Sequence, residues 1–143
     1  MSNYLYLAGP MTGYPQFNYP AFNAAAKTLR GMGYEIINPV DLEPPAVRDA
    51  ALASPDGQLV EGNQVGGETW GAILGRDVAV VADDADGIVF LPSWYRSRGA
   101  VLEATTGLLT GKKFYMYYGK CSPPVLPAQR VADLVRAHLR GAE

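Results

Sequence analysis

Two acidic residues occupy positions from which carboxyl groups could do chemistry, and the first is Asp77. Trp70, Ile73, Leu74 and Val81 recur at helical spacing, and Asp77 falls on the same inward stripe. An unpaired buried charge is costly, so a carboxylate there must be paired, hydrogen-bonded or placed at a cleft. Two interpretations stay open. Asp77 is satisfied by structural partners, or it faces a polar ligand at the edge of a sheet.

The second acidic residue, Glu103, lies in the stretch LPSWYRSRGAVLEATTG, residues 91–107. It falls within the first two turns of an expected helix, where the helix dipole favours an ionised carboxylate. Such a carboxylate beside a sugar is the nucleophile of retaining glycoside chemistry, whereas a surface Glu would make only a capping contact. The helices that carry Asp77 and Glu103 flank one buried strand, so both side chains can converge on its carboxyl end.

The loop before Glu103 has the features of an anion site. Ser97 is a suitable N-cap, and Gly99 leaves backbone amides accessible at the helix start, where the dipole attracts negative charge. Arg96 and Arg98 can add positive charge. A phosphate group or a developing oxyanion fits these features.

The stretch YLYLAGPMTG, residues 4–13, breaks directly after the first expected strand. Gly9 and Pro10 lie at the carboxyl end of that strand, where doubly wound sheets open a ligand crevice. Gly9 lets a ligand approach the backbone, or it serves only the geometry of a turn. No G-x-G-x-x-G follows, so this is not a dinucleotide fingerprint.

The sequence has one residue for thiol chemistry and one for imidazole chemistry. Cys121 is the only cysteine, which excludes an internal disulfide and a multi-cysteine metal site. His138 is the only histidine and falls in the polar register of VADLVRAHLRG, which predicts a solvated helix position. We therefore expect no metal and no cofactor, and we assign any catalysis to carboxylates, hydroxyls and backbone dipoles.

The composition predicts one soluble globular domain over residues 1–143, with 48% hydrophobic and 18% charged residues. A net charge of −2 without a Lys/Arg run argues against a nucleic-acid polymer as partner. The sequence has neither a membrane-spanning stretch nor the pattern of a signal peptide. We expect a cytoplasmic protein with no membrane partner.

Strand and helix patterns alternate along the chain, which predicts an α/β fold: a small doubly wound, flavodoxin-like parallel sheet in three α/β/α layers. In the terminal helix, Val131, Leu134, Val135 and Leu139 are expected to face inward. The expected strands are 4–8, 34–39, 87–92 and 112–118, and the expected helices are 18–33, about 70–81, 97–110 and 127–141.

Residues 41–67 contain prolines and Gly-rich pairs but no sustained period. This pattern predicts a long loop with one short helical turn around 46–53. Loops of this length are usually lids or mobile excursions. We expect a lid over a site, with a mobile excursion as the alternative.

Several motifs, taken in order, resemble the nucleoside 2-deoxyribosyltransferases and the 2′-deoxynucleoside 5′-monophosphate N-glycosidases. They are YLAGP on the first strand, RD on a helix before a buried strand, ADGIVFLP, and SRGAVLEATTG. The strings YLAGPMTG, FNAAAKTLRGMGYEIINP and W-x-x-S-x-G-A-x-x-E are most similar to the phage and prophage branch called DUF4406. The order and spacing of these motifs carry the resemblance over most of the chain.

The resemblance implies roles for individual residues. Glu103 matches the nucleophile, and Asp77 matches the residue that binds deoxyribose and assists protonation near the leaving base. Tyr6 matches a residue that helps position the nucleophile and the substrate. Ser97 stands where the monophosphate hydrolases have a phosphate-binding Ser, which favours a 5′-monophosphate. The residues expected to bind substrate are Gly9, Pro10, Met11, Ser93, Trp94, Ser97, Arg98 and Gly99, with Trp94 or the 41–67 loop over the base.

The leading hypothesis is an enzyme that cleaves or transfers the N-glycosidic bond of a deoxynucleoside 5′-monophosphate or nucleoside through a covalent glycosyl-Glu103 intermediate. The alternative is a non-catalytic protein that senses or sequesters a nucleotide on the same fold, and a purely structural α/β protein is a third option. The expected partner is a small-molecule nucleotide or nucleoside. The resemblance also implies a homo-oligomer.

Overall fold

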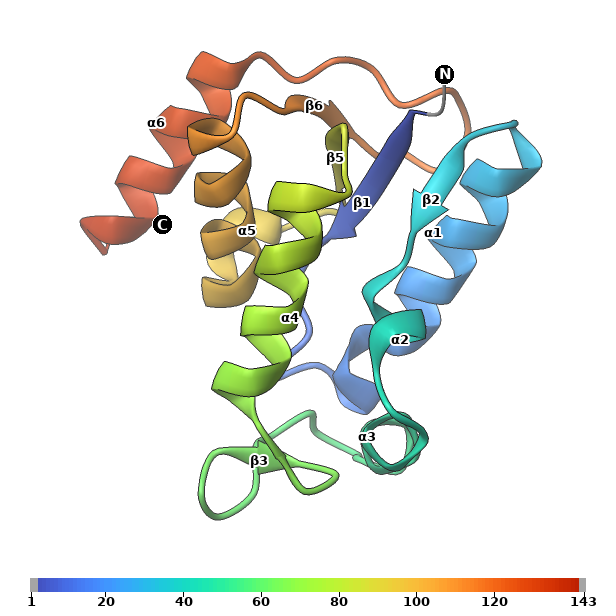
Figure 1. The fold of residues 1–143 in the computed structure, drawn as a ribbon, viewed down its shortest axis with the longest axis vertical. Helices are drawn as coiled ribbons and strands as arrows, with labels where there is room; N and C mark the ends of the chain where they lie inside the picture. Colours follow the sequence, from blue (N-terminus) through green and yellow to red (C-terminus); the bar gives the residue numbers. More distant parts are fainter. Residues whose placement is uncertain (1–2, 142–143) are drawn as a thin grey trace.

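Four parallel strands form the central sheet of the computed structural model, which describes residues 3–141 (Figure 1). Their order is β2-β1-β5-β6, and the chain turns back between β1 and β5 to build the second half of the sheet. Sheets with such a reversal bind ligands beyond the carboxyl ends of the strands at that point. The strands are β1 (Tyr4–Ala8), β2 (Glu35–Ile37), β5 (Gly87–Phe90) and β6 (Lys113–Met116).

Helices cover both faces of this sheet (Figure 1). Helix α1 (Tyr19–Gly31) packs on one face, and helices α4 (Trp70–Asp83), α5 (Arg98–Leu109) and α6 (Ala128–Leu139) pack on the other. The predicted three-layer α/β/α fold is confirmed.

The alternation of side chains along β1 directs a tyrosine toward α5. Leu5 and Leu7 join the core under α1, whereas Tyr6 and Ala8 join the core shared with α4, α5 and α6. Successive residues of a strand point to opposite faces, so Leu5 and Leu7 fix the face to which Tyr6 belongs. The hydroxyl-bearing ring therefore lies among helices that carry acidic residues.

Residues 39–69 hold more regular structure than the predicted loop. They form helices α2 (Pro39–Leu42) and α3 (Pro45–Leu52) and a hairpin of β3 (Gln64–Val65) and β4 (Glu68–Thr69). The connection between β1 and α1 contains the short helix η1 (Pro15–Asn18). Two backbone hydrogen bonds join the 39–69 segment to this connection. Gly13 N donates to Gly57 O, and Gln16 N donates to Ser54 O, both at 2.8 Å. The 39–69 segment is thus fastened to the end of the sheet where β1 stops.

The last helix, α6, differs in one respect from its sequence pattern. Val131 and Val135 are buried as predicted, but Leu139 is 74% exposed. His138, predicted to be solvated, is half-buried, and its Nδ1 lies 2.9 Å from the Tyr95 carbonyl oxygen. No helix within residues 3–141 has the length and apolar character needed to cross a bilayer.

Candidate functional site

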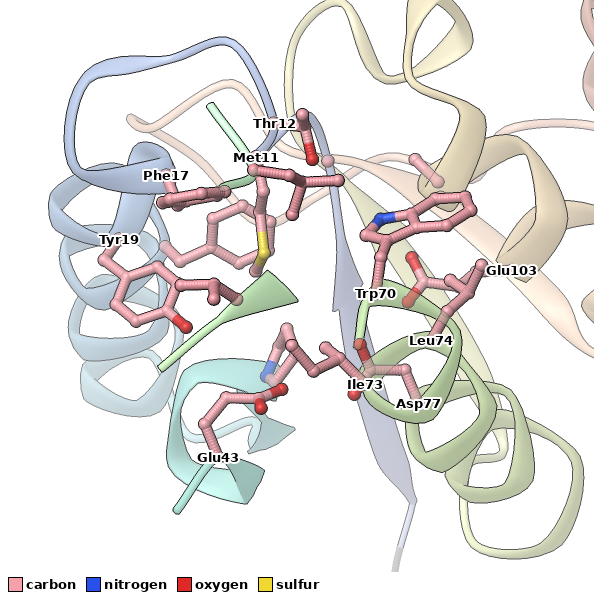
Figure 2. A pocket seen from close by; sticks show the side chains of 17 residues that line it. Met11, Thr12, Phe17, Tyr19, Glu43, Trp70, Ile73, Leu74, Asp77 and Glu103 are labelled. Carbon is pink, nitrogen blue, oxygen red and sulfur yellow. The ribbon is translucent and has the colours of Figure 1, made fainter. Parts of the chain in front are cut away.

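A cavity opens at the carboxyl ends of β1 and β2, with Gly9 and Pro39 among its lining residues (Figure 2). It encloses about 640 Å³ of empty space with its open mouth included. The wall is mostly apolar and rich in aromatic rings, as ligand pockets usually are. Its apolar and aromatic members are Met11, Phe17, Tyr19, Phe22, Pro39, Leu59, Val65, Trp70, Ile73 and Leu74.

Glu103 of α5 lies in the wall of this cavity and is held by Tyr6. The Tyr6 hydroxyl donates a hydrogen bond of 2.5 Å to Glu103 Oε2, and both side chains are buried. Burial, followed by the charge of Glu103, raises the pKa of Tyr6, so the phenol keeps its proton and remains a donor. Glu103 is therefore not the exposed capping residue of the alternative interpretation.

Asp77 of α4 lies in the wall of the same cavity (Figure 2). It is 6% exposed, and its Oδ1 has no hydrogen-bond partner among residues 3–141. Buried polar atoms are nearly always satisfied, so an orphaned oxygen in a cavity wall calls for an explanation. Of the two interpretations of Asp77, its placement at a cleft is the one that the geometry favours.

Burial dominates the protonation of both carboxyl groups. It raises the pKa of Asp77 to about 8, with help from the Glu43 charge and against the opposing effects of Arg76 and the Tyr6 phenol. Burial, followed by the Asp77 charge, also raises the pKa of Glu103. The expected lowering by the helix dipole is thus outweighed by desolvation.

The Tyr6 hydrogen bond distinguishes the two carboxyl groups. The Tyr6 phenol lowers the pKa of both carboxyl groups, but its hydroxyl lies 2.5 Å from Glu103 Oε2, whereas Asp77 Oδ1 has no hydrogen-bond partner among residues 3–141. Like charges this deeply buried resist joint ionisation, so near neutral pH the two carboxyl groups together hold at least one proton. One carboxylate and one carboxylic acid in a single site is the arrangement that acid–base chemistry needs.

The raised pKa of Asp77 predicts a fall in stability with increasing pH. The folded state keeps the Asp77 proton up to about pH 8, whereas the unfolded chain releases it near its ordinary pKa of about 4. Between these values the folded state binds more protons, so the unfolding free energy falls by up to about 1.4 kcal/mol per pH unit. Urea unfolding at pH 5–8 measures this slope, which should flatten in Asp77→Asn but not in Asp83→Asn, an exposed position on the same helix. Equal slopes in all three proteins would contradict the assignment.

A third buried carboxylate, Glu43 of the 39–69 segment, also lines the cavity. Arg76 Nη2 donates to Glu43 Oε2 at 2.7 Å, and Arg76 Nη1 bonds Glu68 at 3.1 Å. Sequence reasoning missed Glu43 because no helical or strand period runs through residues 41–67. It also missed Tyr19 as a wall residue, although the helical pattern of α1 could have placed it.

The structure separates the predicted substrate-binding residues into two groups. Gly9, Met11 and Gly99 line the cavity. Pro10, Ser93, Trp94, Ser97 and Arg98 are not among its lining residues.

Trp94 corrects the prediction of an aromatic cover over the base. It is 1% exposed and stacks on Phe90 with ring centroids 4.0 Å apart, deep in the core under α5. Ser93, at φ +66°, begins the short helix η2 (Trp94–Arg96) that turns this ring inward. Trp70 at the start of α4 lies in the wall instead, and the Arg98 guanidinium sits 4.9 Å from the centre of its ring.

The other two residues outside the lining support the loops beside the cavity. Ser97 caps α5 as predicted, because its Oγ accepts a hydrogen bond of 3.3 Å from Ala100 N. The Pro10 carbonyl accepts a 2.8 Å bond from the Asn18 amide at the start of α1. Pro10 lies between the wall residues Gly9 and Met11 in sequence, and Ser97 lies two positions before Gly99.

Gly9 is required for close packing as well as for access to the cavity. Its φ is not in the left-handed region, but a Cβ built there would lie 2.8 Å from Leu91 Cβ. Overpacking of this kind costs about 1–3 kcal/mol, so Gly9→Ala is expected to lower the unfolding free energy by that amount. Gly71→Ala is the control, since a Cβ there meets nothing within 4 Å and Ala favours the helix. Denaturant titration compares the two, and an unchanged Gly9→Ala protein would contradict the packing role.

Within residues 3–141, no group of three or more His, Cys, Asp or Glu side chains is arranged to hold a metal ion. None of the curated proteins compared with the chain matches it. The family model described as a domain of unknown function (DUF4406) matches residues 3–116, which include β1, α4, β5 and the carboxyl groups of the cavity. The chain therefore belongs to the DUF4406 family.

Proposed function

We propose that the protein cleaves or transfers the N-glycosidic bond of a small nucleotide or nucleoside. A deoxynucleoside 5′-monophosphate is the favoured substrate over a bare nucleoside. The observation that carries the proposal is the pair of buried carboxyl groups, Glu103 and Asp77, in the wall of one aromatic-lined cavity. Tyr6 bonds one of them and leaves the other to hold a proton. The motif resemblance to deoxyribosyltransferases and monophosphate N-glycosidases points to the same chemistry.

In the first step, the Glu103 carboxylate attacks the anomeric carbon of the sugar. The carbon–nitrogen bond breaks, its electron pair goes to the base, and Asp77 donates its proton to a nitrogen of the departing base. The product is a glycosyl ester on Glu103. Tyr6 keeps the attacking oxygen oriented through its hydrogen bond of 2.5 Å.

In the second step, water or a second base attacks the ester at the same carbon. Asp77 takes up the proton that the attacking group releases, and the bond to Glu103 breaks to restore its carboxylate. Hydrolysis and base transfer differ only in this acceptor. The net hydrolysis consumes one water and yields a free base and a deoxyribose 5-phosphate.

The phosphate is assigned to the start of α5. The first amides of a helix have no acceptor within it and attract anions, and Gly99 brings them to the cavity wall. Ser97 Oγ accepts from Ala100 N but keeps its own proton to donate. Because Val65 lies in the cavity wall, we expect the hairpin that carries it to move when a nucleotide enters.

Base release tests the proposal. The protein is incubated with the deoxynucleoside monophosphates and the corresponding nucleosides, with and without a second free base, and the products are separated by chromatography. Free base or exchanged nucleotide is the expected result, with monophosphates consumed faster than nucleosides. Binding without turnover would instead support a nucleotide sensor, and neither binding nor turnover would contradict both.

Two further expectations belong to this proposal. We place the reaction in the cytoplasm, where the substrate would be found, and we expect a homo-oligomer. Leu102 and Leu109 on the outer side of α5 are 42% and 82% exposed, which is the kind of surface that a second copy could cover. Sedimentation analysis would show the assembly, and a monomer at all concentrations would contradict it.

A further inference from the structure

The cavity is rich in hydrogen-bond acceptors and poor in basic or amide side chains. Three carboxyl groups line it, namely those of Glu43, Asp77 and Glu103, whereas its other polar side chains are two hydroxyls and one indole. No Lys, Arg, His, Asn or Gln is among the lining residues that the structure describes. A ligand that presents carbonyl oxygens to this wall would find few donors.

Glu43 faces the cavity from the side opposite Glu103 (Figure 2). Its side chain is 4% exposed, and burial raises the pKa of Glu43, whereas the ion pair with Arg76 behind it at 2.7 Å favours the ionised form and limits that rise. An ionised carboxylate accepts hydrogen bonds and donates none. Arg76 occupies Oε2, which leaves Oε1 to a ligand.

Tyr19 supplies a donor beside this acceptor. The Tyr19 ring stands on the same side of the cavity as Glu43, with its hydroxyl toward the interior (Figure 2). Burial and the Glu43 charge raise the pKa of Tyr19, so the phenol keeps its proton. An acceptor and a donor thus stand next to each other at the end of the cavity away from the nucleophile.

A second observation shows that the cavity is built for a polar ligand. Asp77 is 6% exposed, lines the cavity, and has an Oδ1 without a partner among residues 3–141. Leaving such an atom unsatisfied is costly, and a ligand with a hydrogen-bonding edge would satisfy it. In the proposed reaction Glu103 lies at the sugar. Asp77 then lies near the bond between sugar and base, and Glu43 lies near the far edge of the base.

We infer that this site selects a nucleobase whose outer edge carries an exocyclic amino group beside a ring nitrogen, as cytosine and adenine do. The amino group donates to Glu43, and the ring nitrogen accepts from the Tyr19 hydroxyl. This inference rests on the proposed function. Uracil and hypoxanthine place a carbonyl oxygen where the amino group would be, so that oxygen meets the Glu43 carboxylate, and neither atom has a hydrogen to share.

Matched substrates test the inference, because each pair differs only at that group. The kcat/KM for base release is measured with dCMP against dUMP and with dAMP against dIMP. Sites that hydrogen-bond a substrate group discriminate strongly against analogues that lack it, so we expect at least about a tenfold preference for the amino compound of each pair. Equal values in the wild-type protein would overturn the inference while leaving the proposed function in place.

Glu43→Gln is the informative variant, because its amide can donate to a carbonyl oxygen. We expect the amino-to-carbonyl ratio to fall at least about tenfold in this variant. The ratio is measured within one protein, so a loss of folded fraction does not affect it. Glu68→Gln is the matched control, since Glu68 also pairs with Arg76 but does not line the cavity, and its ratio should stay that of the wild type. An unchanged ratio in Glu43→Gln would overturn the role of Glu43.

Failure of the proposed function has a different signature. If no substrate releases base, the proposed reaction is wrong, and the same pairs are compared by their dissociation constants in calorimetry. Tighter binding of dCMP and dAMP, lost in Glu43→Gln, would still support amino-group recognition. Equal affinities, or no binding of any of the four nucleotides, would overturn it.

Discussion

Glu103→Gln is expected to lower the rate of base release by at least about a thousandfold, because the amide cannot form the ester that splits the reaction into two steps. The substitution keeps the shape of the side chain and lets the Tyr6 hydroxyl donate to the amide oxygen. It also removes a buried group whose pKa is raised by desolvation, so folding should not suffer. Single-turnover assays with a deoxynucleoside monophosphate measure the loss.

The control separates a chemical loss from a structural one. Glu35→Gln changes an exposed residue at the amino end of β2, away from the carboxyl ends of the strands where the cavity opens, and should keep full activity. Nucleotide binding to Glu103→Gln, followed by the shift in melting temperature, should persist. Undiminished base release in Glu103→Gln would show that Glu103 is not the nucleophile.

Asp77→Asn is expected to lower kcat by about two to four orders of magnitude, the usual contribution of a general acid. The same residue sets the pH dependence. With a pKa of about 8, wild-type Asp77 is protonated below that pH and ionised above it, so the rate should fall as pH rises through about 8. The Asn variant has no proton to lose there, and its residual rate should lack this fall. The pH profile of kcat measures both effects.

Asp83→Asn again serves as the control, because it removes an exposed acid from the same helix. Its profile should match that of the wild type. A wild-type rate that keeps rising above pH 9 would show that Asp77 does not act as the acid. Substrates with a better leaving base should lose less activity in Asp77→Asn. This difference distinguishes a loss of proton donation from a structural change in the site.

The sequence predicted the central sheet and the helices that cover it because each of these elements carries a local signal. The buried strand GIVF has no polar residue, and Ser97, the predicted N-cap of α5, caps the first turn of that helix in the structure. The inward stripe of α4 also placed Asp77 correctly toward the core side. Elements of this kind can be predicted from the period of their apolar side chains and from the residues at their ends.

The parts of the site that were missed depend on contacts between distant segments. The ion pair with Arg76, 33 positions further along the chain, holds Glu43, and no local sequence pattern predicts that pair. Trp94 was expected over a ligand because it follows a strand end, but the left-handed backbone at Ser93 turns it into the core. The dipole argument for Glu103 failed because burial, which a single sequence does not reveal, outweighs it.

The central claim is that Glu103 bonds covalently to the sugar, and protein mass spectrometry with a slow substrate tests it most directly. A nucleotide with fluorine at the 2′ carbon is suitable, because the electron-withdrawing group slows hydrolysis of the ester. After an acid quench, we predict one glycosyl phosphate adduct on the peptide that contains Glu103, and none in Glu103→Gln. Release of base with Glu103 unmodified at every time, or an adduct on another residue, would contradict the account.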